Sequence, residues 1–480
     1  MPTAHLHRLL PLAACALLLA ACNQAPVLQV PQLAVPAGFK EVAPWVPAQP
    51  ADHLPRGDWW AVLGDAELNT LQQRLLAGSP DLAAALARYQ QAQATTDQLR
   101  AALVPNVNAS LVDQRNRQSE KRPLRVLGPL SPNEYGSHTL GVAMDYELDL
   151  WGRVRSQVEA GTALDQAAQA DLAAARLALQ AQLADSLLAL RGLDRDAALL
   201  ADTETALGKA LALVRQRHEA GIASGLDVAR AEAQLESVRS QRQQSAGQRA
   251  LIEHAVAALV GDTASGFSLA AAPQPVAAPP EVPPGLPSTL LQRRPDVAAA
   301  ERRVAAANAS VGVARAAVFP AVTLGSVLGY QSNQFGHLIT APNTFWTVGP
   351  SLVVNLFDGG RRQAEINRTQ AVLDENGARY KAVVLGAFAQ VEDSLALLRQ
   401  YAQAAQAEQA ALAANQRTLA LANSRYREGA ASYLEVITAQ TATLQSQRSV
   451  QDLATRRQRA TVQLIRALGG GWSTVAGGAP

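Results

Sequence analysis

The six residues Pro80–Ala85, PDLAAA, return as PDVAAA at Pro295–Ala300, an offset of 215 positions. With that offset held from Pro80 to Val107, 13 of 28 positions are identical. Farther along, an offset of 208 relates a second block, in which the shared residues are Arg217, Gly221, Ala223, Ser224, Leu226 and Val228 with Arg425, Gly429, Ala431, Ser432, Leu434 and Val436. Low complexity alone produces matching alanines, but not matching prolines, glycines and arginines at fixed offsets. The chain therefore contains an internal two-fold repeat, and its first copy carries about seven extra residues between the two blocks.

The composition excludes several classes of protein. Charged residues make up 17% of the 480 positions, with 42 Lys+Arg against 40 Asp+Glu. Because this balance offers no electrostatic attraction for nucleic acid, we expect no nucleic-acid partner. A mean hydropathy of −0.01 is too low for a helical membrane transporter. Two cysteines are too few for a disulfide framework or a thiolate metal cluster.

The N-terminus has the pattern of an export signal. Basic residues up to Arg8 precede an apolar run, Leu9–Ala21, which is too short to span a bilayer but suits the core of a signal peptide. The sequence LAAC at 19–22 resembles a bacterial lipobox. We therefore expect a lipoprotein signal peptide at 1–21 and an acylated Cys22 at the start of the mature chain.

Two observations bear on this anchor. Cys15 ends the same four-residue motif, but only about three apolar residues separate that motif from the basic residues, so Cys22 is the better acylation site. In the lipoprotein families that the signal resembles, Asp after the cysteine favours the inner membrane, and Asn23 is compatible with the outer membrane. The alternative is an ordinary cysteine near a signal cleavage site.

Prolines mark the boundaries between the parts of the chain. Seven fall between Pro26 and Pro55 and seven more between Pro273 and Pro287, and both clusters predict extended linkers. Two long tracts, 133–272 and 351–479, contain no proline and predict long helices. The predicted parts are a lipid-anchored proline-rich segment at 22–58, a first repeat at 59–265, a proline-rich linker at 266–287, a second repeat at 288–470 and a flexible C-terminus at 471–480.

Each copy is predicted to run as a helix, two strands, a very long helix, a turn and a return helix. The long helices are expected at 153–217 and 361–426, each roughly 100 Å long. Their apolar residues recur at the spacing of a coiled coil. The other predicted helices are 81–103, 226–260, 296–318 and 434–468. A first helix stacked end to end on a return helix nearly matches the length of the long helix.

Four segments alternate apolar with polar or small residues, and they are predicted to be strands at about 105–116, 138–150, 320–331 and 344–357. About ten residues suit a strand that crosses a bilayer at a tilt. Four strands cannot close a barrel and an open edge cannot lie in lipid, so transmembrane strands would require the chain to oligomerise. A soluble amphipathic hairpin packed on its own helices is the alternative.

The two loops between these paired strands differ. Residues 113–137 are expected to form a long loop that holds the extra residues of the first copy, whereas 331–344 is shorter and nearly uncharged. The longer loop carries five basic residues, Arg115, Arg117, Lys121, Arg122 and Arg125. The sequence indicates no role for it beyond a solvated surface.

The motifs around the repeat resemble those of the TolC-type outer membrane factors, on the lipoprotein branch that includes OprM and NodT. They are WW at 59–60 with DAEL at 65–68, YELDLWGR at 146–153, NLFDGGR at 355–361, and RYREG at 425–429 with YLEV at 433–436. Each is weak alone, but together they run in order over nearly the whole mature chain. The resemblance implies a mainly α-helical fold with a small β part. It also implies a trimer, in which four strands per chain close a 12-stranded outer-membrane β-barrel that a periplasmic α-helical coiled-coil barrel continues.

The same resemblance implies a function. The chain would be the outer-membrane channel subunit of a tripartite efflux system, and it would conduct small molecules, such as drugs or other toxic compounds, passively to the exterior. The implied partners are two further copies of the chain, a periplasmic adaptor (membrane fusion protein), an inner-membrane pump of the resistance-nodulation-division type and outer-membrane lipid. We expect no metal and no cofactor apart from the covalent lipid at Cys22, and the sequence does not identify the exported substrates or the particular pump.

In this family the periplasmic helix tips constrict the pore, and polar and ionic links between neighbouring helices hold it shut. The turns at 218–226 and 426–434 are therefore expected to form the gate. Carried over residue by residue, the gate candidates are Arg217, Asp227, Arg425, Tyr426, Leu434, Glu435 and Thr438. Relatives often have Asp at the position of Thr438, so we expect Glu435 or Asp227 to supply a ring of carboxylates instead.

Two other functions compete with the channel. An enzyme is disfavoured because the sequence has no phosphate-binding glycine loop, no HExxH motif and no nucleophile elbow. Asp145, Glu147 and Asp149 share one face of a predicted strand, and we expect them to line a wet barrel interior rather than to bind a cation. The second competitor is a lipid-anchored periplasmic coiled-coil scaffold without a pore, which would not need four alternating segments at matched places in the repeat.

Overall fold

The structure is a computed structural model that describes residues 24–31, 40, 58–121, 132–273 and 293–470. The chain divides into two compact units, which we describe separately. The first comprises residues 1–32, 89–168 and 300–380, and the second comprises 33–88, 169–299 and 381–480. The predicted signal peptide, Cys22 and the segment 471–480 lie outside the described residues. No described helix has both the length and the apolar character needed to cross a membrane.

The helices of the two copies match in length, which confirms the repeat. The pairs are α3 (Pro80–Ala101) with α7 (Pro295–Ala316), 22 residues each, α4 (Arg153–Glu219) with α8 (Arg361–Arg427), 67 each, and α5 (Gly225–Leu259) with α9 (Tyr433–Ala467), 35 each. Pro80 and Pro295 are the first residues of α3 and α7, where a missing backbone N–H costs no hydrogen bond.

Two further helices, which were not expected from the sequence, precede α3 in the second unit. They are the short 3₁₀ helix η1 (Trp59–Leu63) and the helix α2 (Ala66–Gly78). The side chain of Asp65 caps α2 by accepting a hydrogen bond from the backbone N–H of Leu68. Leu68, Leu71 and Leu75 of α2 are fully buried in a cluster with both tryptophans of η1 and residues of α4, α5 and α9. This cluster is an apolar core of the second unit.

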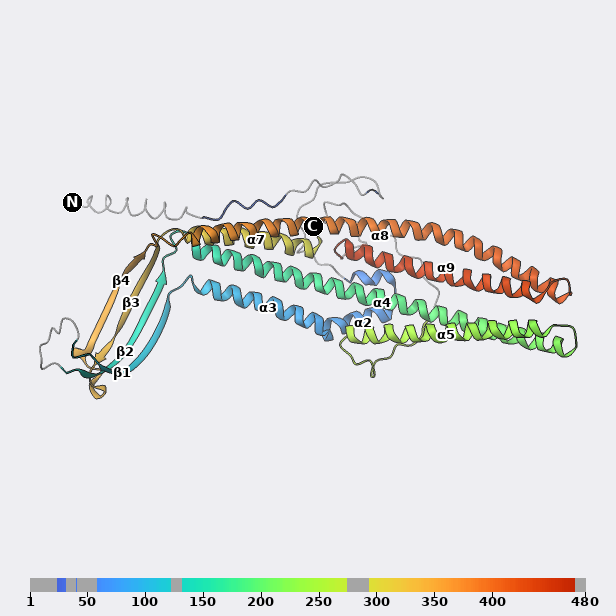
Figure 1. The fold of residues 1–480 in the computed structure, drawn as a ribbon, viewed down its shortest axis with the longest axis horizontal. Coiled ribbons are helices and arrows are strands. Elements are labelled where there is room, and N and C mark those ends of the chain that lie inside the picture. Colours follow the sequence, from blue (N-terminus) through green and yellow to red (C-terminus); the bar gives the residue numbers. More distant parts are fainter. Residues whose placement is uncertain (1–23, 32–39, 41–57, 122–131, 274–292, 471–480) are drawn as a thin grey trace, which may run out of the picture. The chain divides into compact units, whose positions relative to one another are not determined.

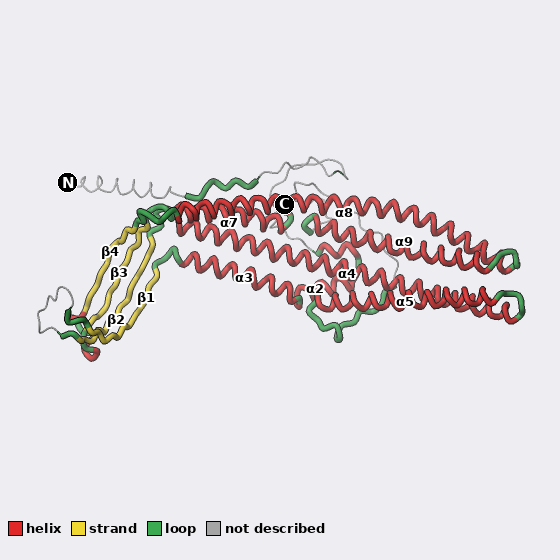
Figure 2. Tube along the Cα trace, viewed as in Figure 1, coloured by secondary structure: helices red, strands yellow, loops and turns green. Residues whose placement is uncertain are grey.

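The first unit contains one antiparallel sheet in the strand order β1-β2-β3-β4 (Figure 2). The strands are β1 (Asn106–Arg117), β2 (Glu134–Glu147), β3 (Ala321–Ser332) and β4 (Thr344–Val353). The register aligns Val142 with Leu328 and Leu328 with Trp346, so that apolar residues from all four strands share one face. The opposite face carries small and polar residues such as Ser110, Gly141 and Gly329. The alternation expected from the sequence thus gives the sheet one apolar face and one face of small and polar residues.

The basic loop is shorter than predicted. The strand expected at 138–150 begins four residues earlier, at Glu134, and the first strand extends to Arg117. Glu134 forms ion pairs of 3.4 Å with Arg115 and 3.6 Å with Arg117, so opposite charges extend the strand pair into the predicted loop. Residues 122–131 lie outside the described part of the chain.

Two strands end earlier than predicted, because the residues after them cap helices. β2 ends at Glu147 rather than 150, and the Asp149 carboxylate accepts hydrogen bonds from the backbone N–H groups of the first turn of α4. β4 ends at Val353 rather than 357. The Asp358 carboxylate accepts hydrogen bonds from the backbone N–H groups of Gly360, just before α8, and of Arg362 in its first turn. A carboxylate that binds free N–H groups at a helix start stabilises the helix.

These caps correct the prediction of three lumenal acids. The Asp149 carboxylate caps the start of α4. Glu147, the last residue of β2, accepts hydrogen bonds from the Arg153 guanidinium, one of them at 2.8 Å. Asp145 lies inside the strand, on the small and polar face. Within the described ranges, no group of His, Cys, Asp or Glu is arranged to hold a metal ion.

Candidate functional site

The two long hairpins of the second unit, α4–α5 and α8–α9, end in turns of the same construction (Figure 1). In each turn a glycine follows the long helix with a positive φ, 75° at Gly221 and 76° at Gly429. A left-handed residue here lets later N–H groups return to the helix, and Ile222 and Ala430 each donate to a carbonyl five residues back at 2.8 Å. The sequence match at these glycines therefore reflects a required turn conformation.

The return helices start with capping boxes, and these involve the two carboxylates expected to form a ring. The Asp227 N–H donates to Ser224 Oγ at 3.2 Å, while the Asp227 carboxylate accepts from the Ser224 backbone N–H at 3.4 Å. In the second copy the Ser432 N–H donates to Glu435 Oε1, also at 3.4 Å. Both acids therefore stabilise their helix starts, a role that was not expected from the sequence.

Arg217 and Tyr426, both gate candidates, meet across the two copies. The guanidinium of Arg217 lies 4.7 Å from the centre of the Tyr426 ring, in cation–π geometry. It also donates to the backbone carbonyls of Tyr426 at 3.3 Å and Arg427 at 3.5 Å. One arginine at the end of α4 thus binds the end of α8, which lies 209 residues later in the sequence.

Tyr433, which is not among the gate candidates, completes this contact. Its ring lies 5.3 Å from that of Tyr426, and the side chain is buried beside Leu211, Val214 and Val436. Burial raises the pKa of the Tyr433 phenol to about 12, with smaller contributions from Tyr426 and Asp227, so the ring stays neutral. Tyr433 lies within the turn predicted at 426–434, and an aromatic residue there was the available signal.

The remaining candidates lie on the surface of the second turn. Arg425 is 3.7 Å from the Glu435 carboxylate and donates to the Ala430 carbonyl at 3.1 Å. The Thr438 hydroxyl donates to the carbonyl of Leu434 within its own helix at 2.8 Å, while the Leu434 side chain is about half exposed. The turns therefore expose charged and apolar groups around the Arg217–Tyr426 contact.

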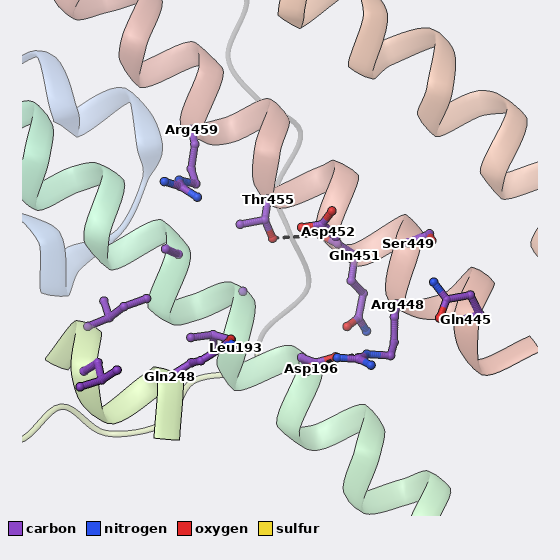
Figure 3. A pocket seen from close by; sticks show the side chains of 14 residues that line it. Leu193, Asp196, Gln248, Gln445, Arg448, Ser449, Gln451, Asp452, Thr455 and Arg459 are labelled. Atoms are coloured by element: carbon purple, nitrogen blue, oxygen red, sulfur yellow. Dashed lines mark hydrogen bonds and ion pairs between the residues drawn. The ribbon is translucent and has the colours of Figure 1, made fainter. Parts of the chain in front are cut away.

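A second set of contacts between the copies, which was not expected from the sequence, lies away from the turns. Arg448 of α9 binds Asp196 of α4 through two hydrogen bonds, of 2.7 and 3.0 Å (Figure 3). Arg459 binds Asp185 in the same way, at 2.9 and 2.8 Å. A cavity of about 680 Å³ lies along α4, α5 and α9 beside these pairs. The only signal in the sequence was the equal spacing of the two aspartates and the two arginines.

Comparison with known proteins agrees with this architecture. The family model described as "Outer membrane efflux protein" matches residues 71–262 and 286–470. The outer membrane protein OprJ of Pseudomonas aeruginosa is 32% identical over 95% of this chain and 94% of its own length. The pyoverdine export outer membrane protein OpmQ of the same species is 35% identical over 95% of this chain and 96% of its own. The crystal structure of the outer membrane protein VceC of Vibrio cholerae superposes with a TM-score of 0.79 at 27% identity, covering 88% of this chain and all of that one.

The matches extend over both copies of the repeat and over nearly the full length of the relatives. They confirm the resemblance to TolC-type factors that the motifs indicated, and the relatives are transport channels. The chain therefore belongs to the outer membrane efflux protein family and is an outer-membrane efflux channel that extends into the periplasm.

Proposed function

We propose that three copies of this chain form one channel, with a 12-stranded barrel in the outer membrane and a helical tunnel below it. The observation that carries the proposal is the sheet in the first unit. Its apolar face is exposed in the single chain, most of all at Trp346, Leu352 and Val107, and β1 and β4 each pair on one side only within the described residues. Lipid would cover that face, and β4 of one copy pairing with β1 of the next would remove both edges.

We further propose that Cys22 carries the lipid that the N-terminal signal predicts. The described segment after it supports this, because it is held against the first unit. The Asn308 side chain of α7 donates to the Pro26 carbonyl at 2.7 Å. A Cβ atom on Gly312 would lie only 2.8 Å from the Ala25 Cβ atom, so this position has room for no side chain. Docking so close to Cys22 in sequence would keep the anchor near the first unit.

The turns of the two hairpins form the gate in this proposal. Arg217 links the ends of α4 and α8, and the exposed Leu434, Ile222 and Leu226 offer apolar contacts to an adaptor. We propose that a periplasmic adaptor binds there and that an inner-membrane pump of the resistance-nodulation-division type supplies the energy. The channel itself would conduct passively, without catalysis and without a cofactor. Relatives named for antibiotic and toluene efflux support small toxic compounds as substrates.

The channel is tested by isolating the protein from the outer membrane. We expect a trimer that dissociates on SDS gels only after heating, conducts in planar bilayers and incorporates labelled palmitate. Replacement of Cys22 by Ser should abolish the palmitate label, while the conductance of any trimer that assembles should remain. A protein that becomes a soluble, non-conducting monomer once the lipid is removed would instead indicate the scaffold without a pore.

The proposed carboxylate ring is tested by substitutions that preserve the helix caps. Glu435→Gln and Asp227→Asn remove the charge but keep an oxygen able to accept the capping hydrogen bond. If either residue forms the ring, the corresponding trimer should show a K⁺ over Cl⁻ permeability ratio that is lower by about twofold or more in planar bilayers, because rings of carboxylates select cations. Glu232→Gln, at an exposed ion pair with Arg215, is the matched control. Unchanged selectivity in both variants would rule out these residues as the ring.

A further inference from the structure

The strand register of the sheet repeats from one copy to the other. Ala109 of β1 is opposite Val142 of β2. Their equivalents at the offsets of 215 and 208, Leu324 of β3 and Pro350 of β4, are opposite each other in the same way. The two offsets found in the sequence therefore hold through both strand pairs, so a register seen in one copy predicts the register in the other.

The two copies of one chain are joined through β2 and β3. Their register places His138 opposite Ser332. Five residues farther along β2, Ala143 is opposite Val327. In a ring of three chains the six copies alternate, so the remaining junctions join β4 of one chain to β1 of the next.

The single chain leaves this second kind of junction open. β1 and β4 are the edge strands of the sheet (Figure 2). Most of their residues are exposed, whereas most residues of β2 and β3 are partly or fully covered. A second copy of the chain is the occupant that the repeat predicts, because the copies then continue one sheet around the ring.

The repeat also predicts which residues meet at the open junction. A rotation by one copy carries β2 onto β4 and carries β3 onto β1 of the next chain. The two offsets then give the opposite pairs, which are Trp346 with Arg117, Thr347 with Asn116, Val348 with Arg115, and Ser351 with Val112.

The predicted register keeps the two faces of the sheet continuous across the junction. Trp346 lies on the apolar face, in register with Leu328, and Arg117 lies on the same face of β1 as Leu111. Thr347 is on the opposite face, which carries small and polar residues. A slip of one residue would exchange the faces of one strand, so only registers that differ by two residues compete with this one.

Trp346 and Arg117 have complementary chemistry across the junction. The Trp346 residue is 71% exposed and the Arg117 side chain 75% exposed in the single chain. Opposite residues of an antiparallel pair have Cβ atoms about 4.5–5.5 Å apart, so a guanidinium can lie over an indole ring there. Arg117 can keep its ion pair with Glu134, because a guanidinium binds a carboxylate through its edge and a ring through its face. The equivalent residues within the chain are His138 and Ser332, so this contact is confined to the boundaries between chains.

We propose that β4 of one chain pairs with β1 of the next chain in this register, and that Arg117 of the next chain stacks on Trp346 across the boundary. The inference rests on the trimeric barrel of the proposed function. It adds the register that closes the barrel and the pair of side chains that strengthens each boundary between chains.

Two matched cysteine pairs on the interior face of the barrel test the register. They are Ser351→Cys with Val112→Cys and Thr347→Cys with Asn116→Cys, and each places two thiols directly opposite each other across the boundary. Opposite Cα atoms about 4.5–5.5 Å apart suit a disulfide. The second pair guards against a failure of the first to fold.

Two slipped pairs are the controls. Ser351→Cys with Ser110→Cys and Ser351→Cys with Gln114→Cys keep both thiols on the same face but place them two residues out of register. Such diagonal neighbours are about 7–8 Å apart, too far for a disulfide without movement of the backbone. In the proposed lipoprotein, acylation blocks Cys22 and signal cleavage removes Cys15, so the introduced thiols are the only free ones.

Oxidation should convert both matched pairs, and neither slipped pair, into covalent dimers and trimers on non-reducing gels. The covalent trimers should still conduct in planar bilayers, because the boundary is closed in the working channel. Crosslinking of a slipped pair in place of the matched pairs would overturn the register. A conducting trimer in which no pair crosslinks, or a covalent trimer that no longer conducts, would overturn the proposed pairing of β4 with β1. Absence of any trimer in the unsubstituted protein would instead refute the proposed function.

A double-mutant cycle tests the contact between the side chains. Trp346→Leu and Arg117→Gln should each lower the temperature at which the trimer dissociates by several degrees. The double variant should go no lower than the more affected single variant, because both changes remove the same contact. Arg115→Gln is the matched control, because it removes the other arginine paired with Glu134, but the register places Arg115 opposite Val348.

The effects of Arg115→Gln and Trp346→Leu should therefore add. Additive effects of Arg117→Gln and Trp346→Leu would refute the contact. Coupling of Trp346 with Arg115 in place of Arg117 would show a register that is slipped by two residues.

Discussion

A chain carrying Gly261→Val is not expected to yield folded channel. Gly261 has φ of 78°, and a Cβ atom there would lie 2.0 Å from the carbonyl oxygen and 2.8 Å from the carbonyl carbon of Gly78. Both contacts are with backbone at the end of α2, so only a shift of α2 can relieve them. That shift would expose some of Leu68, Leu71 and Leu75, each worth about 1.5–3 kcal/mol when buried. The sum approaches the whole stability of an ordinary domain, about 5–15 kcal/mol.

The measurement is the amount of heat-resistant trimer in outer-membrane fractions, together with the melting of any purified protein. Gly208→Ala is the control, because Gly208 lies within α4 and has nothing within 4 Å of its Cβ position. That change should be neutral or stabilising by about 0.5–1 kcal/mol. A Gly261→Val trimer that melts close to the wild type would show that the contact between Gly78 and Gly261 is not required.

Arg217→Ala should open the proposed gate. The substitution removes a cation–π contact and two hydrogen bonds to backbone carbonyls, together worth about 1–2 kcal/mol in each chain. If three hairpin tips open together, the total is about 3–6 kcal/mol, and every 1.4 kcal/mol changes a ratio of populations about tenfold. The ratio of open to closed channels should therefore rise by about two to four powers of ten.

Single-channel recording in planar bilayers measures this ratio. Arg217→Lys keeps the charge but not the planar fork, so it should give an intermediate opening. Arg215→Ala is the matched control, because it removes an exposed ion pair with Glu232 two residues away, and such pairs contribute about 1 kcal/mol at most. Equal opening of the Arg215 and Arg217 variants would show that the loss of charge at the tip, and not the contact with Tyr426, is responsible.

The sequence predicted the repeat and the long helices because the information for both is local. Proline-free tracts predict helices, and fixed offsets predict that the copies fold alike. The strand ends were predicted less well, because they depend on where Asp149 and Asp358 cap the following helices. The helix α2 was missed even though Leu68, Leu71 and Leu75 follow a helical spacing after the capping Asp65.

Contacts between the two copies could not be predicted from local patterns. Arg217 was a candidate, but nothing near it in the sequence indicates that it binds Tyr426. Arg448 and Asp196 are 252 residues apart, and each resembles a solvated helix residue when read alone. The offset that relates the copies identifies equivalent positions, yet it does not say which helix of one copy faces which helix of the other. Only the fold supplies that information.

The equal lengths of the paired helices limit which insertions can lengthen the helical part of the protein. A single residue inserted into α4 would rotate the part of the helix between the insertion and the turn by about 100°. It would also advance that part by about 1.5 Å, and both changes would separate Arg217 from Tyr426. A longer tunnel would require insertions of one size in all four long hairpin helices at once, each close to a whole number of helical turns so that the faces realign. Changes in length must therefore be inherited as matched sets, while the loops and the proline-rich linker can vary one residue at a time.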